Sequence, residues 1–132
     1  MTDVHYLLAS TALAWLMIMA AAELHTPTWT RAGFRLAFGN RDDELPEPSV
    51  LAGRAARASR NMLENMVLFV ALFVAARSAG FDPTAGAAIF FFSRLAYFPV
   101  YLAGIVYVRS ALWGVSLVGL GWMALGALGV VG

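Results

Sequence analysis

Two long stretches without charge constrain the fold of this chain more than any other feature. Residues 4–22 and 111–132 contain no Asp, Glu, Lys or Arg. A helix needs roughly 20 predominantly apolar residues to cross the hydrocarbon core of a bilayer, and both stretches are of about that length. With 61% hydrophobic residues and a mean hydropathy of +0.72, the chain is also more apolar than a typical soluble domain. The sequence therefore predicts an integral membrane protein.

The first apolar stretch has a second interpretation as a cleaved signal peptide, because Ala20 to Ala22 resemble a small-residue cleavage site. A signal peptide begins with a positively charged region, whereas the amino-terminal region here holds Asp3 and no arginine. We therefore expect a permanent helix over residues 4–24.

Two further spans are predicted in the middle of the chain, and both carry charge into the membrane. Only the twelve residues from Asn65 to Ala76 are uncharged, so a crossing helix must extend back through Glu64. The next span holds Arg94 about ten residues from its start, near mid-depth at a rise of about 1.5 Å per residue. We predict one all-α membrane domain over residues 1–132, a bundle of four helices at about 4–24, 54–77, 84–107 and 111–131.

The distribution of arginine predicts the orientation. Seven of the nine basic residues lie in or beside the first and third connections, including Arg109 in an expected tight turn, whereas the opposite side has only Arg77. The positive-inside rule then places both termini outside the cytoplasm, in an inner or plasma membrane, and residues 25–53 within it. The seven are Arg31, Arg35, Arg41, Arg54, Arg57, Arg60 and Arg109.

The long connection over residues 25–53 has two parts. In residues 28–39, TWTRAGFRLAFG, aromatic and aliphatic side chains alternate with two arginines, a pattern typical of a segment at the membrane interface. The following NRDDELPEP is typical of a solvated, turn-rich segment. The net charge of +1 gives no indication of a nucleic-acid partner, and we expect none.

Polar residues form one stripe on each of the two middle spans, and we expect the stripes to face each other. An unpaired charge at that depth costs several kcal/mol, so ionisable residues there usually pair and mark a functional cavity. We predict an ion pair between Glu64 and Arg94. The stripes comprise Arg57, Asn61 and Glu64, with Arg60 beside them, in the second span, and Arg94, Tyr97 and Tyr101 in the third.

Residues 57–65, RASRNMLEN, and residues 94–101, RLAYFPVY, together resemble the MAPEG family, the membrane-associated proteins of eicosanoid and glutathione metabolism. In the second helix of that family, an arginine is followed by an asparagine four residues on and a glutamate three beyond that. Arg57, Asn61 and Glu64 match this pattern.

The third helix of the family carries an arginine with tyrosines three and seven residues later, which Arg94, Tyr97 and Tyr101 match. The resemblance implies a trimer of four-helix subunits, with glutathione held at each subunit interface near the cytoplasmic side. It also implies an arginine near the start of the fourth helix that stabilises the glutathione thiolate. Arg109, with Ser110 beside it, is the candidate for this catalytic role.

Glutathione offers two carboxylates, an ammonium and a thiol, so its site requires arginines for the carboxylates and a carboxylate for the ammonium. The resemblance therefore implies a glutathione-binding set in which arginine and amide groups bind the carboxylates, a glutamate receives the ammonium or orients an arginine, and tyrosines donate hydroxyl protons. Arg57, Arg60 and Asn61 are the candidates for the carboxylates, and Glu64, with Arg94 beside it, is the candidate for the ammonium. Tyr97 and Tyr101 are the candidate hydroxyl donors.

Two departures from the family bear on substrate and shape. Leu68 stands where many members have a proline, which affects the bend of the second helix. The end of the first helix is Glu23, Leu24, His25, whereas several eicosanoid-metabolising members are basic there. This difference disfavours an eicosanoid substrate.

The leading hypothesis is a glutathione-dependent transferase or peroxidase that acts on hydrophobic electrophiles or lipid hydroperoxides reaching it from the bilayer. The alternative is a non-catalytic family member, a lipid-binding or accessory subunit in which the polar stripes serve assembly. A small transporter is disfavoured, because four spans without a pair of broken helices do not fit that class.

Several of these residues also have purely structural interpretations. Arg54, Arg57 and Arg60 are each compatible with a positive anchor at a helix end. The pair of Glu64 and Arg94 is compatible with an ion pair that fixes helix register.

No catalytic or ligand-binding role is predicted for Trp113 or for the two histidines. Trp113 is expected to face lipid or to pack between helices. His5 and His25 lie at opposite ends of the first span, about 30 Å apart by helical rise, so we expect no metal site.

Overall fold

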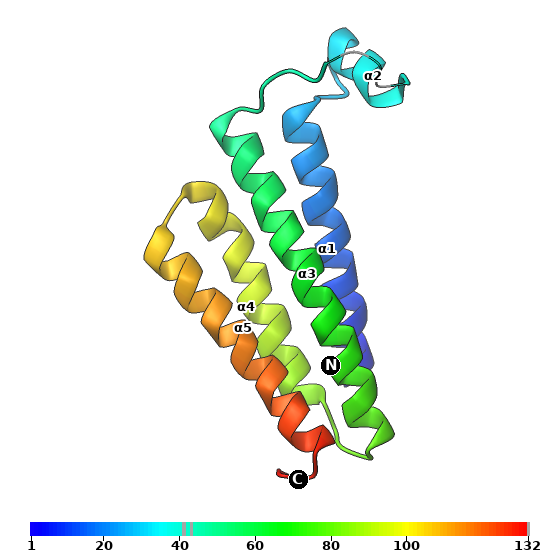
Figure 1. Cartoon of the computed structure of the whole chain (residues 1–132), viewed down its shortest axis with the longest axis vertical. Coiled ribbons are helices and arrows are strands. Elements are labelled where there is room, and N and C mark those ends of the chain that lie inside the picture. The colour runs from blue at the N-terminus through cyan, green and yellow to red at the C-terminus, as the bar shows by residue number, and fades with distance from the viewer. Residues whose placement is uncertain (41, 43, 132) are drawn as a thin grey trace.

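The computed structural model shows a bundle of four long helices, with a short fifth helix at one end (Figure 1). It describes residues 1–40, 42 and 44–131, so Arg41, one of the arginines that predict the orientation, lies outside the described residues. Each of the four long helices is long and apolar enough to cross a membrane. The chain is an all-α integral membrane protein, as the sequence predicts. The long helices are α1 (Asp3–His25), α3 (Val50–Ser78), α4 (Thr84–Ala103) and α5 (Val106–Ala127), and the short one is α2 (Arg31–Phe38).

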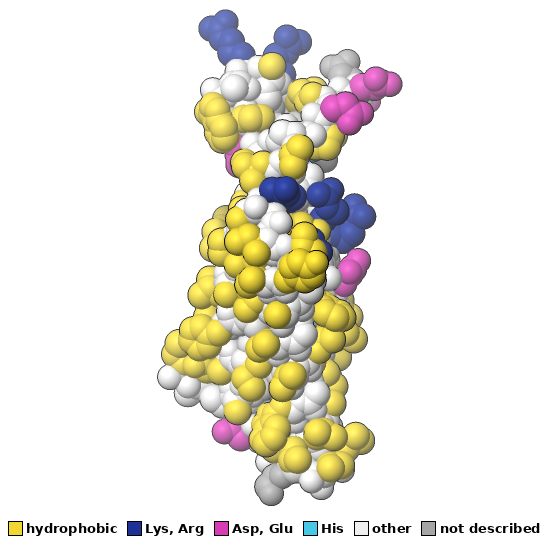
Figure 2. Space-filling model, turned by 90° about the vertical axis from the view of Figure 1, so that its left-hand side faces the viewer, with side chains coloured by type: hydrophobic (Ala, Val, Ile, Leu, Met, Phe, Trp, Pro, Cys, Tyr) yellow, Lys and Arg dark blue, Asp and Glu magenta, His cyan; other side chains and the backbone are white. Residues whose placement is uncertain are grey.

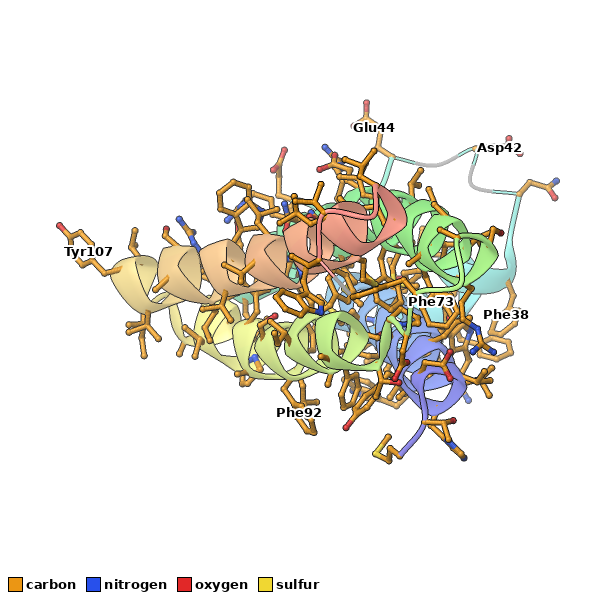
Figure 3. The ribbon with its side chains drawn as sticks, turned by 90° about the horizontal axis from the view of Figure 1, so that it is seen from below. Phe38, Asp42, Glu44, Phe73, Phe92 and Tyr107 are labelled. Atoms are coloured by element: carbon orange, nitrogen blue, oxygen red, sulfur yellow. The ribbon has the colours of Figure 1, made fainter. Side chains whose placement is uncertain are left out.

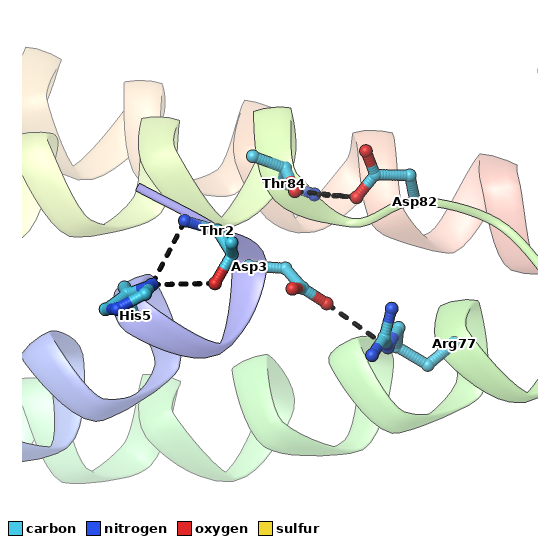
Figure 4. A network of polar contacts seen from close by, with 6 residues as sticks. All are labelled: Thr2, Asp3, His5, Arg77, Asp82 and Thr84. Atoms are coloured by element: carbon cyan, nitrogen blue, oxygen red, sulfur yellow. Dashed lines mark hydrogen bonds and ion pairs between the residues drawn. The ribbon is translucent and has the colours of Figure 1, made fainter.

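The two termini lie at one end of the bundle, and α2 lies at the other (Figure 1). At the terminal end, Arg77 Nε is 3.2 Å from Asp3 Oδ2, which ties the end of α3 to the start of α1 (Figure 4). In the next connection, the Thr84 hydroxyl and backbone N–H donate to Asp82 Oδ1 at 2.6 Å and 3.0 Å. These two hydrogen bonds hold the pKa of the Asp82 carboxyl below its usual value. Polar contacts thus fix the ends of three helices where the chain leaves the apolar core.

The sequence predicts a boundary between the last two long helices at residues 108–110. In the structure this boundary lies earlier, at residues 104–105. The helix α4 ends at Ala103 because Gly104 adopts a φ of +79° and its N–H donates to the Tyr101 carbonyl at 3.0 Å. A glycine in this left-handed conformation is a common helix terminator. As a result, Arg109 lies in the first turn of α5 rather than in the connection.

The helix α3 begins at Val50, four residues before the predicted start at 54. Ser49 caps it, since its hydroxyl oxygen accepts a hydrogen bond from the Ala52 backbone N–H at 3.1 Å. The earlier start shortens the first connection and places Arg57 two turns inside the helix.

The core is packed mainly by alanine, phenylalanine and methionine side chains. The rings of Phe69 and Phe90 stack at a centroid distance of 4.3 Å between α3 and α4. Viewed along the bundle, Phe73 lies among the helices, whereas Phe92 and Tyr107 project from the periphery (Figure 3). Because lipid is as apolar as these side chains, close packing must hold the helices together in the membrane.

A close backbone contact joins α4 and α5 through Gly86 and Gly119. A Cβ atom on Gly119 would lie 2.6 Å from the carbonyl oxygen of Gly86 and 3.0 Å from the Phe90 backbone nitrogen. Neither backbone atom can move without separating the helices, so small residues are required here.

We therefore expect Gly119→Ala to destabilise the bundle by about 1–3 kcal/mol through overpacking. The matched control is Gly121→Ala on the same helix, where a Cβ would meet nothing within 4 Å. That variant should be neutral or slightly stabilising, because alanine has the higher helix propensity. Thermal unfolding in detergent measures both, and equal stability of the two variants would contradict the packing argument.

Candidate functional site

An open hollow of about 340 Å³ lies between α3, α4 and α5 toward the α2 end of the bundle. Three helices contribute to it, and six of the seven residues that line it belong to the set predicted from the sequence. The hollow therefore brings together side chains that are up to 56 positions apart in the chain, from Arg57 to Trp113. The lining residues are Arg57 and Asn61 from α3, Tyr97 and Tyr101 from α4, and Arg109, Ser110 and Trp113 from α5.

Arg94 lies behind the hollow rather than in it. Its side chain is completely buried, and its Nη1 donates to Asn61 Oδ1 at 2.7 Å. The guanidinium carbon also lies 5.1 Å from the ring centroid of Tyr97 and 5.5 Å from that of Phe90, within the range of cation–π attraction. Among the described residues, Nε and Nη2 of Arg94 have no hydrogen-bond partner.

The contact with Arg94 sets the direction of the Asn61 amide. Because Oδ1 accepts from Arg94, the Nδ2 group is the part of this amide that remains for a ligand. Arg94 thus acts on the hollow through Asn61, without lining it.

The predicted ion pair between Glu64 and Arg94 is wrong within a single subunit. Asn61 occupies the position beside Arg94, and Glu64 is exposed on the surface of α3. At about 100° per residue, Glu64 lies about 60° around the helix from Asn61, which takes it off the face that contacts α4. Among the described residues, the only ion pair is the one between Arg77 and Asp3.

Arg60 and Glu64 do not line the hollow. Arg60 instead borders a separate open groove of about 370 Å³ between α1 and α3, which His25 and Ser59 also line. These two predicted glutathione-binding residues therefore face away from the other members of the set within one subunit.

Aromatic contacts hold Arg109 in place. Its guanidinium carbon lies 4.8 Å from the ring centroid of Tyr101, and the rings of Tyr97 and Tyr101 meet edge to face at 5.4 Å. These contacts use the π-face of the tyrosine and leave the guanidinium N–H groups available as donors.

Ser110 is less available than its neighbour. Its hydroxyl donates to the Val106 carbonyl at 3.0 Å, inside the first turn of α5. Only the lone pairs of its oxygen remain for a ligand, so the geometry gives Ser110 no role as a proton donor.

A sequence model of the MAPEG family matches residues 6–129. The chain belongs to the MAPEG family. The match covers three long helices of this MAPEG protein completely, all but the first three residues of α1, and both polar stripes. It confirms the resemblance that the two short motifs indicate. No curated protein and no solved structure matches the chain.

Two residues of this MAPEG protein, one in the hollow and one beside it, have contacts that the sequence does not predict. Trp113 lines the hollow, although it was expected to face lipid or to pack between helices. The signal was its spacing, because Trp113 lies one turn after Arg109 on α5. Arg54, interpreted as a membrane anchor, donates from Nη1 to the Leu102 carbonyl at 3.0 Å and so caps the end of α4.

The hollow of this MAPEG protein is rich in hydrogen-bond donors and positive charge. Two guanidiniums, two phenols, an amide, an indole and the Ser110 hydroxyl line it, and none of these seven described residues carries a carboxylate. Such a lining suits an anionic ligand with more than one acceptor group. Within the part of the chain that the structure describes, no group of three His, Asp or Glu side chains could hold a metal ion.

Proposed function

We propose that this MAPEG protein binds glutathione in the hollow and uses it as a transferase or peroxidase. The observation that carries the proposal is the convergence of Arg57, Asn61, Tyr97, Tyr101 and Arg109 from three helices on one donor-rich hollow. Glutathione is a frequent co-substrate in the family to which the chain belongs.

The residues divide according to the groups of glutathione. Arg57 and the Nδ2 group of Asn61 bind carboxylates, for which charge-assisted hydrogen bonds are the strongest available. Arg109 lies at the thiol and favours the thiolate, and Tyr97 and Tyr101 supply hydroxyl donors. Free glutathione has few thiolates at neutral pH, because an ordinary thiol has a pKa of about 8.5. Stabilising the thiolate is therefore the step for which the protein must provide a charge.

The second substrate is a hydrophobic electrophile or a lipid hydroperoxide that enters from the bilayer. Hydrophobic side chains cover much of the flank of the bundle, and arginine side chains gather toward the α2 end (Figure 2). With an electrophile, the thiolate sulfur forms a bond to the electrophilic atom as the leaving group departs with its electron pair. With a hydroperoxide, the sulfur attacks the terminal oxygen, the O–O bond breaks and the alkoxide takes up a proton, and a second glutathione reduces the resulting sulfenic acid to the disulfide and water. A substrate dissolved in lipid reaches the hollow without crossing water.

Charge on the surface of α3 favours assembly into a homotrimer. Arg57, Arg60 and Glu64 are exposed on one subunit although they lie inside a helix that crosses the membrane. Contact of these groups with lipid would cost several kcal/mol, whereas a neighbouring subunit would cover them. In such a trimer, glutathione lies at the subunit interface, and Glu64 receives its ammonium or pairs with an arginine there.

The same arginines support an orientation with the α2 end in the cytoplasm. Six of the seven arginines counted for this prediction are described by the structure, and all six lie toward that end. The proposal places both termini outside the cytoplasm and the protein in an inner or plasma membrane.

Glutathione binding by the purified protein in detergent tests the proposal. We expect calorimetry to detect binding, and Arg57→Gln to weaken it at least about tenfold, since a hydrogen bond to a charged group contributes about 1.5–3 kcal/mol. Arg35→Gln, which removes an exposed charge on α2 that does not line the hollow, is the matched control and should bind as the native chain does. No binding by a folded native chain at millimolar glutathione would favour the accessory role instead.

A further inference from the structure

The short helix α2 has an aromatic flank that no long helix covers. This flank consists of Trp29, Phe34 and Phe38, which are 75%, 54% and 72% exposed. The rings of Phe34 and Phe38 lie one turn apart, with centroids 4.6 Å from each other. Among the described residues, α2 packs against none of the long helices. Phe38 projects outward at the periphery of the molecule (Figure 3).

The position of α2 is nevertheless fixed by its connection to α1. Gly33 packs so closely on Pro27 that a Cβ atom would collide with the Pro27 carbonyl oxygen. Thr30 caps the helix by accepting from the Gly33 N–H at 3.0 Å. Thr28 donates from its backbone N–H and its hydroxyl to the Glu23 carboxylate, at 3.0 Å and 2.8 Å. These contacts present the aromatic flank in a defined direction.

Two arginines border the aromatic flank. Arg31 and Arg35 are exposed and one turn apart, and no acid among the described residues pairs with either. Arg35 shares one open hollow of about 690 Å³ with Phe34 and Phe38, and a second of about 340 Å³ with Trp29 and Phe34. Arginine side chains project beyond the end of the bundle in Figure 2, with hydrophobic side chains on the flank below them. Each hollow thus joins an apolar wall to a guanidinium.

The length of the connection fixes the level of α2 relative to the membrane. Only residues 26–30 separate it from α1, whose last turn ends at His25. Five residues span at most about 17 Å when fully extended, and here they are folded into a turn. Since α1 is a membrane span, α2 begins within about 17 Å of the end of that span, close enough to reach the headgroup region.

We propose that α2 is an interfacial anchor that binds anionic phospholipids. Its aromatic flank lies in the glycerol region, where aromatic rings are favoured, and Arg31 and Arg35 bind the headgroup phosphates above it. Charge complementarity identifies the occupant, because two exposed arginines beside exposed rings, with no described acid paired to them, match the phosphate and acyl boundary of such a lipid. The anchor is independent of glutathione and sets the depth of the connection between α1 and α3.

Labelling at single cysteines tests where the flank lies, because the chain has no cysteine of its own. The full chain carrying Phe38→Cys, labelled with an environment-sensitive fluorophore, is placed in phosphatidylcholine vesicles with and without phosphatidylglycerol. The control is Glu44→Cys, an exposed position in the polar connection after α2 that lines neither hollow. We expect lipid-borne nitroxide to quench the label at 38, and aqueous iodide to quench the label at 44.

A second measurement tests the arginines. Arg31→Gln and Arg35→Gln should each weaken the retention of phosphatidylglycerol by about fivefold, since one basic residue at an anionic surface contributes about 1 kcal/mol. Arg77→Gln, at the other end of the bundle, should leave this retention unchanged.

Three results would overturn the proposal. Equal quenching of both labels by iodide would place the flank in water. Protection of the label at position 38 from iodide that increases with the protein-to-lipid ratio, without quenching by lipid-borne nitroxide, would identify a second copy of the chain as the occupant of the flank. Unchanged phosphatidylglycerol retention in both arginine variants would remove the basis for anionic lipid binding.

Discussion

Asn61→Leu is expected to destabilise the bundle by about 3 kcal/mol, more than any other polar substitution on α3. Leucine branches at Cγ as asparagine does, but its two methyl groups are bulkier and cannot accept a hydrogen bond. Arg94 is completely buried, and Asn61 Oδ1 is its one hydrogen-bond partner among the described residues. The substitution therefore leaves a buried guanidinium with only its cation–π contacts to Phe90 and Tyr97.

The same argument predicts that a second substitution compensates for the first. Arg94→Met removes the buried charge together with its need for a partner, so alone it should cost less than Asn61→Leu. The double variant should recover about half or more of the loss, which is a coupling of about 1.5 kcal/mol or more in a double-mutant cycle. Unfolding of each purified variant in mixed micelles measures the cycle.

Asn65→Leu provides the matched control for this cycle. Asn65 is buried one turn further along α3 and donates to the Asn61 carbonyl at 2.8 Å, without a contact to Arg94. Its replacement should cost about 1 kcal/mol, the usual contribution of a neutral hydrogen bond, and should not couple to Arg94→Met. If the losses of stability caused by Asn61→Leu and Arg94→Met add strictly in the double variant, the hydrogen bond between Asn61 and Arg94 contributes little to stability.

Helical periodicity predicted which residues belong to the site better than it predicted which of them contact one another. The spacing of polar residues placed Arg57, Asn61 and Tyr97 on facing helix surfaces, and the structure brings them to one hollow. Periodicity identifies the side of a helix, but a stripe is wide enough to hold both a residue that touches the next helix and one that does not. Asn61 and Glu64 differ by less than one turn, and only packing decides which of them meets Arg94.

The end of α4 could not be found from composition, because the residues around it are apolar on both sides. Glycines are common inside membrane helices, so Gly104 alone did not indicate a turn. Its positive φ and its contact with the Arg54 guanidinium, which a Cβ would meet at 2.6 Å, become visible only in the folded chain. The boundary matters for function because it moves Arg109 from a connection into a helix.

The placement of Arg109 in the first turn of α5 is unfavourable for the helix itself. The amino-terminal end of a helix carries partial positive charge, and a cation there is destabilising by a few tenths of a kcal/mol or more. A role in binding the anionic form of a ligand offers a reason for the arginine at this position. Removing it should therefore leave the fold intact, so any loss of activity reports on the site.

Arg109→Ala is expected to lower turnover at neutral pH by about tenfold or more while glutathione binding stays nearly intact. In the proposed site, Arg57 and Asn61 would still bind the carboxylates, whereas the charge that favours the thiolate would be lost. An interaction with the reacting form affects rate more than affinity. The ultraviolet absorbance of bound thiolate should disappear in parallel.

The pH dependence separates this role from a structural one. Without Arg109, the thiol should ionise near the ordinary pKa of about 8.5, so turnover of the variant should rise with pH and approach that of the native chain above this value. Arg109→Lys, which keeps the charge, should restore part of the thiolate absorbance and part of the rate. If Arg109→Ala changes neither thiolate formation nor rate, the catalytic assignment is wrong, and the arginine serves only to orient the last two helices in the membrane.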